Sequence, residues 1–171
     1  MATNSRTLEF TLLSAEGLHI RGKPADKNVF AVVRADSIAS HTTATATATG
    51  SNGSLSWKET FSVEVGAHAR CMTIEVKCRT GAGERDVGVA RIALSDFLGG
   101  SVPEHKLQFL CYRLRDWDGR ENGIVNFSVR VVAPPPHDGG AEDDCAPSLG
   151  GVVTGIPVWR NESSTSSMSN V

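Results

Sequence analysis

The sequence lacks the features that place a chain in or across a membrane. No apolar run approaches the ~20 residues that a membrane-spanning helix needs. Residues 1–17 show no basic stretch followed by an apolar one, position 2 is Ala2 rather than glycine, and the last residues hold no cysteine for lipidation. We therefore expect a cytoplasmic protein without a signal peptide or lipid anchor, whose contact with any membrane is peripheral.

Motifs of the common catalytic and metal sites are also missing. There is no Gly-x-Ser-x-Gly motif, and no glycine-rich phosphate loop precedes a helix. The histidines and cysteines are too scattered for metal-binding spacing. They are His19, His41, His68, His105, His137, Cys71, Cys78, Cys111 and Cys145. The sequence therefore favours a protein that is not an enzyme, has no small-molecule substrate and needs no cofactor.

Charge is unevenly divided along the chain. Residues 1–132 hold 16 Lys and Arg against 14 Asp and Glu, whereas residues 133–171 hold one Arg against five acids. A surplus of two positive charges and an aromatic content of 6% do not indicate nucleic-acid binding. Five of the seven prolines lie beyond residue 132. We expect one domain over 1–132 and a mostly disordered acidic tail over 133–171.

One segment of this tail differs from the rest. Residues 150–159 read GGVVTGIPVW and are apolar enough to pack against a surface, although Pro157 argues against a central strand. The segment is either the remnant of a linker or a short docking motif, and the sequence leaves both interpretations open.

The pattern over residues 7–132 is that of β-strands. Leu8, Phe10 and Leu12 alternate with polar residues, as expected of a strand with one buried face. Turn residues separate the apolar segments, with Asn52-Gly53 and Asn122-Gly123 as examples. The other strand candidates are 29–34, 42–48, 61–65, 72–78, 87–94, 106–114 and 125–131. Eight short strands in one domain predict an all-β, antiparallel β-sandwich.

Three segments resemble a C2 domain, a module that many proteins use to meet phospholipid surfaces. Residues 8–18, LEFTLLSAEGL, are similar to the strand that leads into the first apical loop. Residues 53–65, GSLSWKETFSVEV, keep Trp57 and Phe61 at the anchor positions of the family's Asn-Pro-x-Trp-Asn-Glu-x-Phe segment. Residues 87–97, VGVARIALSDF, resemble the Ile-Gly-x-x-x-Ile-x-Leu strand after the third apical loop.

Two further likenesses narrow the resemblance. Residues 123–132, GIVNFSVRVV, resemble a strand that some C2 domains place first, and its position at the end of this domain implies the type II topology. The opening RTLEFTLLSAEGL and the ending HKLQFLCYRLRD are most similar to plant C2 proteins described as BON-associated. That resemblance implies a copine-like membrane protein as partner and a role in restraining plant defence and cell death.

The acidic residues of calcium-dependent C2 domains are mostly absent. In that family, acidic side chains of the first and third apical loops converge on calcium, which takes about six to eight oxygen ligands. Aligning Val87-Gly88 with the family's Ile-Gly places Cys78, Thr80 and Glu84 at the three acidic positions of the third loop. Only one carboxylate remains there.

The first loop has lost a ligand too. Asn28 stands where the family has an aspartate, and Asp26 is nearby but out of register. We therefore predict no metal site of high affinity, with Asp26 and Glu84 as the only weak candidates, and calcium is not favoured as a cofactor.

Basic residues occupy the same two loops. Their net charge is +2, because five cations face Asp26, Glu84 and Asp86, and we predict that they contact lipid or a partner. At about 1 kcal/mol for each basic residue near an anionic leaflet, this attraction is weak. Some C2 domains bind lipid through a second, lysine-rich site on a concave face. This chain is a poor match for that site, since residues 41–49 of the corresponding strand hold no lysine. The five predicted contact residues are Arg21, Lys23, Lys27, Arg79 and Arg85.

The leading hypothesis is a non-enzymatic adaptor that is peripheral at the plasma membrane. It would bind anionic phospholipid weakly and a copine-like membrane protein. The alternatives are a calcium-dependent phospholipid-binding sensor and a soluble scaffold without membrane contact.

Overall fold

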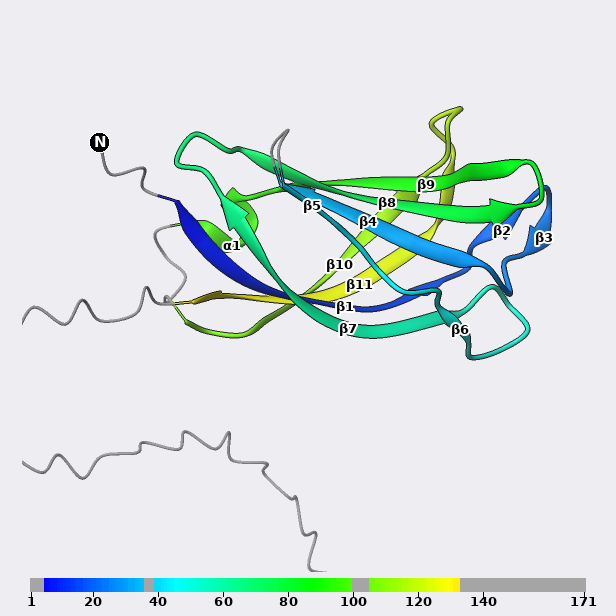
Figure 1. Cartoon of the computed structure of the whole chain (residues 1–171), viewed down its shortest axis with the longest axis horizontal. Coiled ribbons are helices and arrows are strands. Elements are labelled where there is room, and N and C mark those ends of the chain that lie inside the picture. The colour runs from blue at the N-terminus through cyan, green and yellow to red at the C-terminus, as the bar shows by residue number, and fades with distance from the viewer. Residues whose placement is uncertain (1–4, 36–38, 100–104, 133–171) are drawn as a thin grey trace, which may run out of the picture. The chain divides into compact units, whose positions relative to one another are not determined.

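The computed structural model describes residues 5–35, 39–99 and 105–132 of the 171-residue chain (Figure 1). The predicted tail over 133–171 and its apolar segment at 150–159 lie outside the described residues. In the part of the chain that is described, no helix has the length and apolar character needed to cross a membrane.

Among the described residues, the elements are strands apart from one short helix. Seven strands are long: β1 (Arg6–Glu16), β4 (Val29–Ala35), β7 (Leu55–Val65), β8 (Cys71–Thr80), β9 (Gly83–Ala93), β10 (Gln108–Arg115) and β11 (Glu121–Val132). The short elements are β2 (His19–Ile20), β3 (Lys23–Pro24), β5 (Ala39–Thr42), β6 (Thr47–Ala48) and the helix α1 (Ser95–Leu98). Every strand pairing is antiparallel, which confirms the predicted fold class.

The strands form two layers (Figure 1). One layer has the order β5-β4-β8-β9, and the other has the order β10-β11-β1-β7-β6. Within the described residues, the layers are joined by a single pairing between β9 and β10, that of Val89 with Arg115. Each layer is hydrophobic on its inner face, so packing the two together buries both faces.

The last strand lies beside the first. β11 pairs with β1 from Thr7↔Val132 to Glu16↔Ile124, and its other edge pairs with β10. This position of the C-terminal strand is the one that the type II topology predicts for residues 123–132.

The core follows the alternation seen in the sequence. Phe10 is fully buried on β1, and its ring lies 4.9 Å from that of Phe127 on β11 and 5.4 Å from that of Phe61 on β7, measured between centroids. Burial of apolar side chains at about 25 cal/mol per Å² is the main force that holds the layers together. The other large, fully buried side chains are Phe30, Phe97, Leu8, Leu12, Leu18, Leu55, Met72, Ile74, Ile92 and Leu114.

The strand predicted over 42–48 is instead divided into β5 and β6. β5 pairs with β4 in one layer, whereas β6 pairs with β7 in the other. Between β5 and β6 the chain runs beside β4 without forming a strand. Two backbone hydrogen bonds hold it there, because the N–H groups of Thr43 and Ala46 donate to the carbonyls of Ala31 and Val29, respectively. The segment crosses from layer to layer, so it cannot remain in one regular ladder.

Candidate functional site

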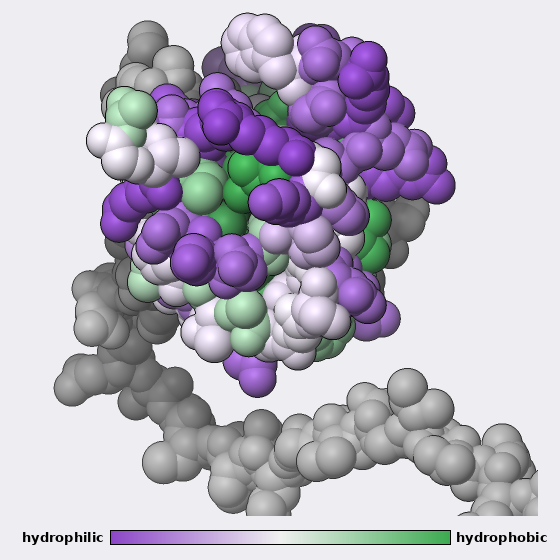
Figure 2. Space-filling view, turned by 90° about the vertical axis from the view of Figure 1, so that its right-hand side faces the viewer, coloured by the Kyte–Doolittle hydropathy of each residue, from purple (hydrophilic) through white to green (hydrophobic). Residues whose placement is uncertain are grey.

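The residues predicted to bind lipid or a partner lie at one end of the sandwich. We call this the loop end, and it comprises residues 17–28 and 77–86. In Figure 1 it is on the right, where β2 and β3 lie beside the turn between β8 and β9. Figure 2, which views the molecule from that side, shows hydrophilic side chains around a small hydrophobic centre.

The first predicted loop contains a small hairpin. His19 pairs with Pro24 and Ile20 with Lys23, which leaves Arg21 and Gly22 as a two-residue turn. Both turn residues have positive φ, 52° for Arg21 and 76° for Gly22, as the tight turns of two-residue hairpins require. The turn places Arg21 at an exposed tip with Lys23 exposed beside it.

The third predicted loop is a tight hairpin rather than an open loop. Thr80 pairs with Gly83 and its hydroxyl donates to the Gly83 carbonyl at 2.9 Å, so only two residues form the turn. Arg79 therefore lies on β8, while Glu84 and Arg85 lie on β9. The interpretation of these residues as loop residues was wrong, because strand pairing continues almost to the tip.

A buried thiol stands at the first of the expected acidic positions. Cys78 is 8% exposed, and its sulfur lies 3.8 Å from the carbonyl oxygen of Lys27 and 3.6 Å from that of Arg79. Burial raises the pKa of this thiol, nearby Arg85 lowers the pKa by a smaller amount, and Asp26 raises it further. The net shift is upward, so the group is neutral at pH 7.

The two weak candidates for metal ligands do not share a site. Glu84 lies opposite Arg79 in the strand register, on one face of the hairpin. The charge of Asp26 raises the pKa of Cys78, whose side chain points to the other face of the hairpin. Among the described residues, no three His, Cys, Asp or Glu side chains gather as metal ligands would. A thiol and two separated carboxylates do not fit calcium, which takes about six to eight oxygens.

The structure brings the five predicted contact residues to the same end. Arg21 and Lys23 lie on the β2–β3 hairpin, and the Lys27 backbone packs against β8. Arg79 and Arg85 lie on the β8–β9 hairpin, and the Arg79 guanidinium lies 4.6 Å from the centre of the Phe30 ring. Within the described ranges, none of the five forms an ion pair.

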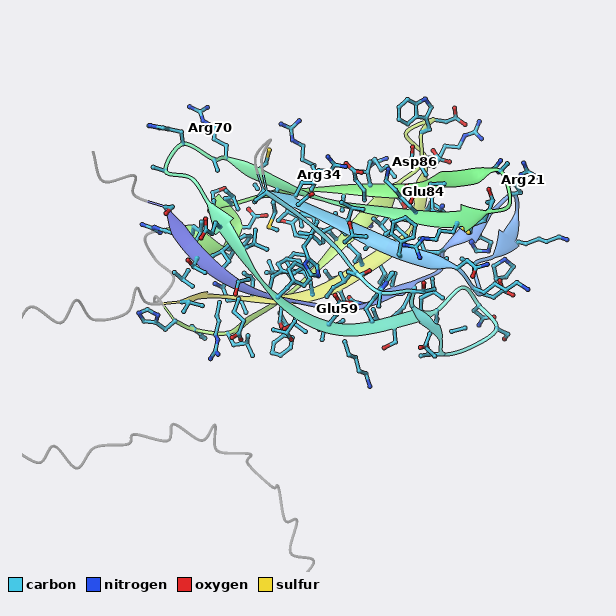
Figure 3. The ribbon with its side chains drawn as sticks, viewed as in Figure 1. Arg21, Arg34, Glu59, Arg70, Glu84 and Asp86 are labelled. Carbon is cyan, nitrogen blue, oxygen red and sulfur yellow. The ribbon has the colours of Figure 1, made fainter. Side chains whose placement is uncertain are left out.

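Lys77 adds a positive charge to the five cations predicted from the sequence. Its ammonium lies 3.2 Å from Asp86, one of the three acids that were set against the basic residues. Figure 3 marks Arg21, Glu84 and Asp86 at this end. Counting Lys77 raises the net charge of the loop end from +2 to +3.

Asn122 on β11 holds the loop end together. Its amide donates to the carbonyls of His19 at 3.0 Å and Val87 at 2.8 Å, and its oxygen accepts from the His19 N–H at 2.9 Å. The sequence indicated only a turn at Asn122-Gly123. These contacts join residues more than 30 apart in the chain, so no local pattern signals them.

This two-layer arrangement is that of a C2 domain. A C2 domain-containing protein attributed to an elicitor-responsive gene superposes with a TM-score of 0.60 at 21% identity, covering 81% of this chain and 98% of that one. The C2A domain of plant extended synaptotagmin 1 superposes with a TM-score of 0.58 at 16% identity, covering 75% and 97%. At these identities, the likeness concerns the fold alone.

The chain belongs to the C2-domain proteins. It is 40% identical over 141 residues to BON1-associated protein 2 of Arabidopsis thaliana, covering 80% of this chain and 66% of that protein. The chain thus spans about two thirds of the length of this relative. No family model matches the chain.

Proposed function

We propose that this protein is a non-enzymatic adaptor at the plasma membrane. Its loop end meets anionic phospholipid without calcium, while a membrane-associated protein supplies the remaining affinity. The observation that carries the proposal is the +3 charge of the loop end. Its five predicted contact residues form no ion pair within the described ranges, and its first expected acidic position holds a neutral thiol.

The magnitude of the attraction argues for a second contact. Three net charges contribute about 3 kcal/mol at an anionic leaflet, a factor of roughly 150 in the binding constant. Attraction of this size biases the protein toward the membrane but does not anchor it. A protein partner at the same surface would multiply the two affinities through effective concentration.

The identity of the partner follows from likeness. The name of BON1-associated protein 2 states an association with BON1 for that protein. By the resemblance to the BON-associated proteins, we propose a copine-like membrane protein as the partner of this chain and restraint of defence and cell death as its role.

A matched pair of variants tests the lipid contact. Arg21→Gln with Lys23→Gln removes two exposed charges from the loop end, and Lys58→Gln with Lys106→Gln removes two exposed charges elsewhere. Sedimentation with vesicles of phosphatidylserine and phosphatidylcholine should show binding that is roughly 30-fold weaker for the first variant and unchanged for the second. Equal losses in both variants would mean that net charge, and not the loop end, attracts the vesicles.

A further inference from the structure

Trp117 is 92% exposed on a turn that is itself well ordered by hydrogen bonds. The Asp116 carboxylate accepts from the N–H of Asp118 at 3.0 Å and of Arg120 at 2.9 Å. The Asp116 N–H donates to the Arg120 carbonyl at 2.9 Å, and the Gly119 N–H donates to the Asp116 carbonyl at 3.0 Å. These bonds hold the backbone so that the indole stays in solvent, and tryptophan in such a position is typical of an interface.

A hollow of about 200 Å³ lies beside this indole. Figure 1 shows the β10–β11 turn rising past β9, where Gly88 and Val89 line the hollow. Val89 is 42% exposed, and the backbone of Gly88 forms part of the wall. A Cβ at Gly88 would lie 3.1 Å from that of Leu114, so close packing of β9 on β10 favours glycine there. Indole, valine and backbone thus give the hollow an apolar surface.

The charged groups around the hollow carry an excess of one negative charge. The carboxylates are those of Glu75, Asp86 and Asp116, and the cations are Lys77 and Arg115. The Arg115 guanidinium already donates to the Gly119 carbonyl at 2.8 Å. The side chains that line the hollow therefore differ in net sign from those of the loop end.

Lys77 is engaged by two of these carboxylates. Its ammonium lies 3.5 Å from Glu75 and 3.2 Å from Asp86, and Glu75 also pairs with Arg34 at 3.4 Å. Burial alone would lower the pKa of Lys77, but the hydrogen bonds and charges of Asp86 and Glu75 outweigh it and raise the pKa. Lys77 therefore remains a paired cation. The Asp86 side chain is still 57% exposed and can accept a further donor.

We infer that this hollow takes the side chain of an arginine or lysine on a protein partner. The methylene stem of such a side chain would lie on Val89, and its cationic head would stack on the Trp117 indole beside Asp86. The Asp86 carboxylate, which is 57% exposed, attracts a cation and repels an anionic headgroup, so the hollow favours a basic peptide over a phospholipid surface. The inference rests on the proposed adaptor function and adds the chemistry of its protein contact.

Titration with two short peptides tests this inference. The probe is acetyl-Gly-Ala-Arg-Ala-Gly-amide, and its control carries citrulline, the neutral isostere of arginine, at the same position. The nuclear magnetic resonance signal of the Trp117 indole N–H in the full chain reports binding. We expect a saturable shift in the millimolar range with the arginine peptide, and binding of the citrulline peptide that is weaker by about three- to five-fold.

Variants assign the binding to the hollow, with amide shifts of Gly88 and Val89 as the readout. Trp117→Ala should weaken arginine-peptide binding by about three- to five-fold, and Trp117→Phe, which keeps an aromatic face, by about two-fold at most. Phe109 is also a largely exposed aromatic, and Phe109→Ala should leave binding unchanged. Thermal unfolding should be nearly the same for all three variants, because neither side chain is buried.

Several results would overturn the inference. Equal affinity for the arginine and citrulline peptides, no saturable shift, or full binding by Trp117→Ala would each contradict it. Shifts of the Trp117 signal by phosphatidylserine vesicles and not by peptide would assign the indole to the membrane instead. Vesicle binding by the loop-end variants is measured separately, so failure of this inference and failure of the proposed function are distinguishable.

Discussion

Cys78 and Arg85 lie directly opposite each other on the β8–β9 hairpin, and the alignment places Cys78 where a calcium-dependent C2 domain has a carboxylate. The thiol is buried and neutral, and the neighbouring charge is positive. Both features oppose cation binding. The same hairpin carries Arg79 and thereby turns a potential metal site into part of a basic surface.

A carboxylate at position 78 should destabilise the domain. Cys78→Asp places a charge where only 8% of the residue is exposed, and Arg85 compensates only partly. We expect the free energy of unfolding to fall by about 1–3 kcal/mol, as measured by urea unfolding at pH 7. Cys78→Ser, which keeps a small neutral group, should cost less. A Cys78→Asp variant as stable as the parent would show that this end tolerates negative charge.

Removing Asn122 should loosen the loop end. Asn122→Ala deletes the three hydrogen bonds to His19 and Val87 and should cost about 2 kcal/mol of unfolding free energy. Amide hydrogen exchange should accelerate at residues 17–20. Asn126 is a matched control on the same strand. Its amide donates to the side chains of Ser14 and Glu16, whereas Asn122 bonds the backbone of the loop end. Equal costs for Asn122→Ala and Asn126→Ala would contradict the role assigned to Asn122.

Stability should fall at alkaline pH because of Tyr112. Burial, followed by the hydrogen bond that Tyr112 donates to Asp96 and the charge of Asp96, raises its pKa from 10.0 to about 12. Because the pKa of Tyr112 is higher in the folded state, its protonated hydroxyl contributes its full stabilisation of the fold below pH 10. This stabilisation is lost as the pH rises toward about 12. Solvent screening limits the loss to about 1 kcal/mol. Urea unfolding between pH 9 and 12 measures it.

The Tyr112→Phe variant isolates this effect from other groups. Lys77, whose pKa is also raised, is present in both the parent and the variant, so its contribution cancels in the comparison. The difference between the two pH profiles therefore belongs to Tyr112. Parallel profiles over the whole range would refute the contribution.

The core and the surface should respond differently to loss of an aromatic ring. Phe127 is fully buried against Phe10, and Phe127→Ala should lower the free energy of unfolding by about 3–5 kcal/mol. Phe109 is 71% exposed on β10, and Phe109→Ala should change the free energy of unfolding by about 0.5 kcal/mol or less. Chemical denaturation of both variants provides the comparison. Similar costs would mean that the assigned layers are wrong.

Much of the fold was predictable because alternation specifies which face of a strand is buried. Leu8, Phe10 and Leu12 are all fully buried, as their spacing predicts. The Thr and Ala residues at 42–48 alternate as well, but they are small on both faces and do not specify a layer. That segment therefore crosses between layers, and a single strand was the wrong prediction.

The site was predictable only in part. Alignment on Val87-Gly88 predicts that Cys78 replaces an acidic ligand, but it does not predict that the thiol is buried against the backbone of Lys27. The pairing of Lys77 with Asp86 depends on a register shift after Val76, which leaves no mark in the sequence. The hollow beside Trp117 likewise depends on how β9 and β10 approach each other, a tertiary relationship that no local pattern predicts.

Vesicle sedimentation of the whole chain in the presence of a calcium chelator decides whether lipid binding by the loop end depends on calcium. We expect binding to vesicles containing phosphatidylserine to persist in the chelator, to weaken steeply as salt is raised and to be absent on pure phosphatidylcholine. Binding that appears only when calcium is added would refute the proposed adaptor function and would identify a calcium-dependent sensor.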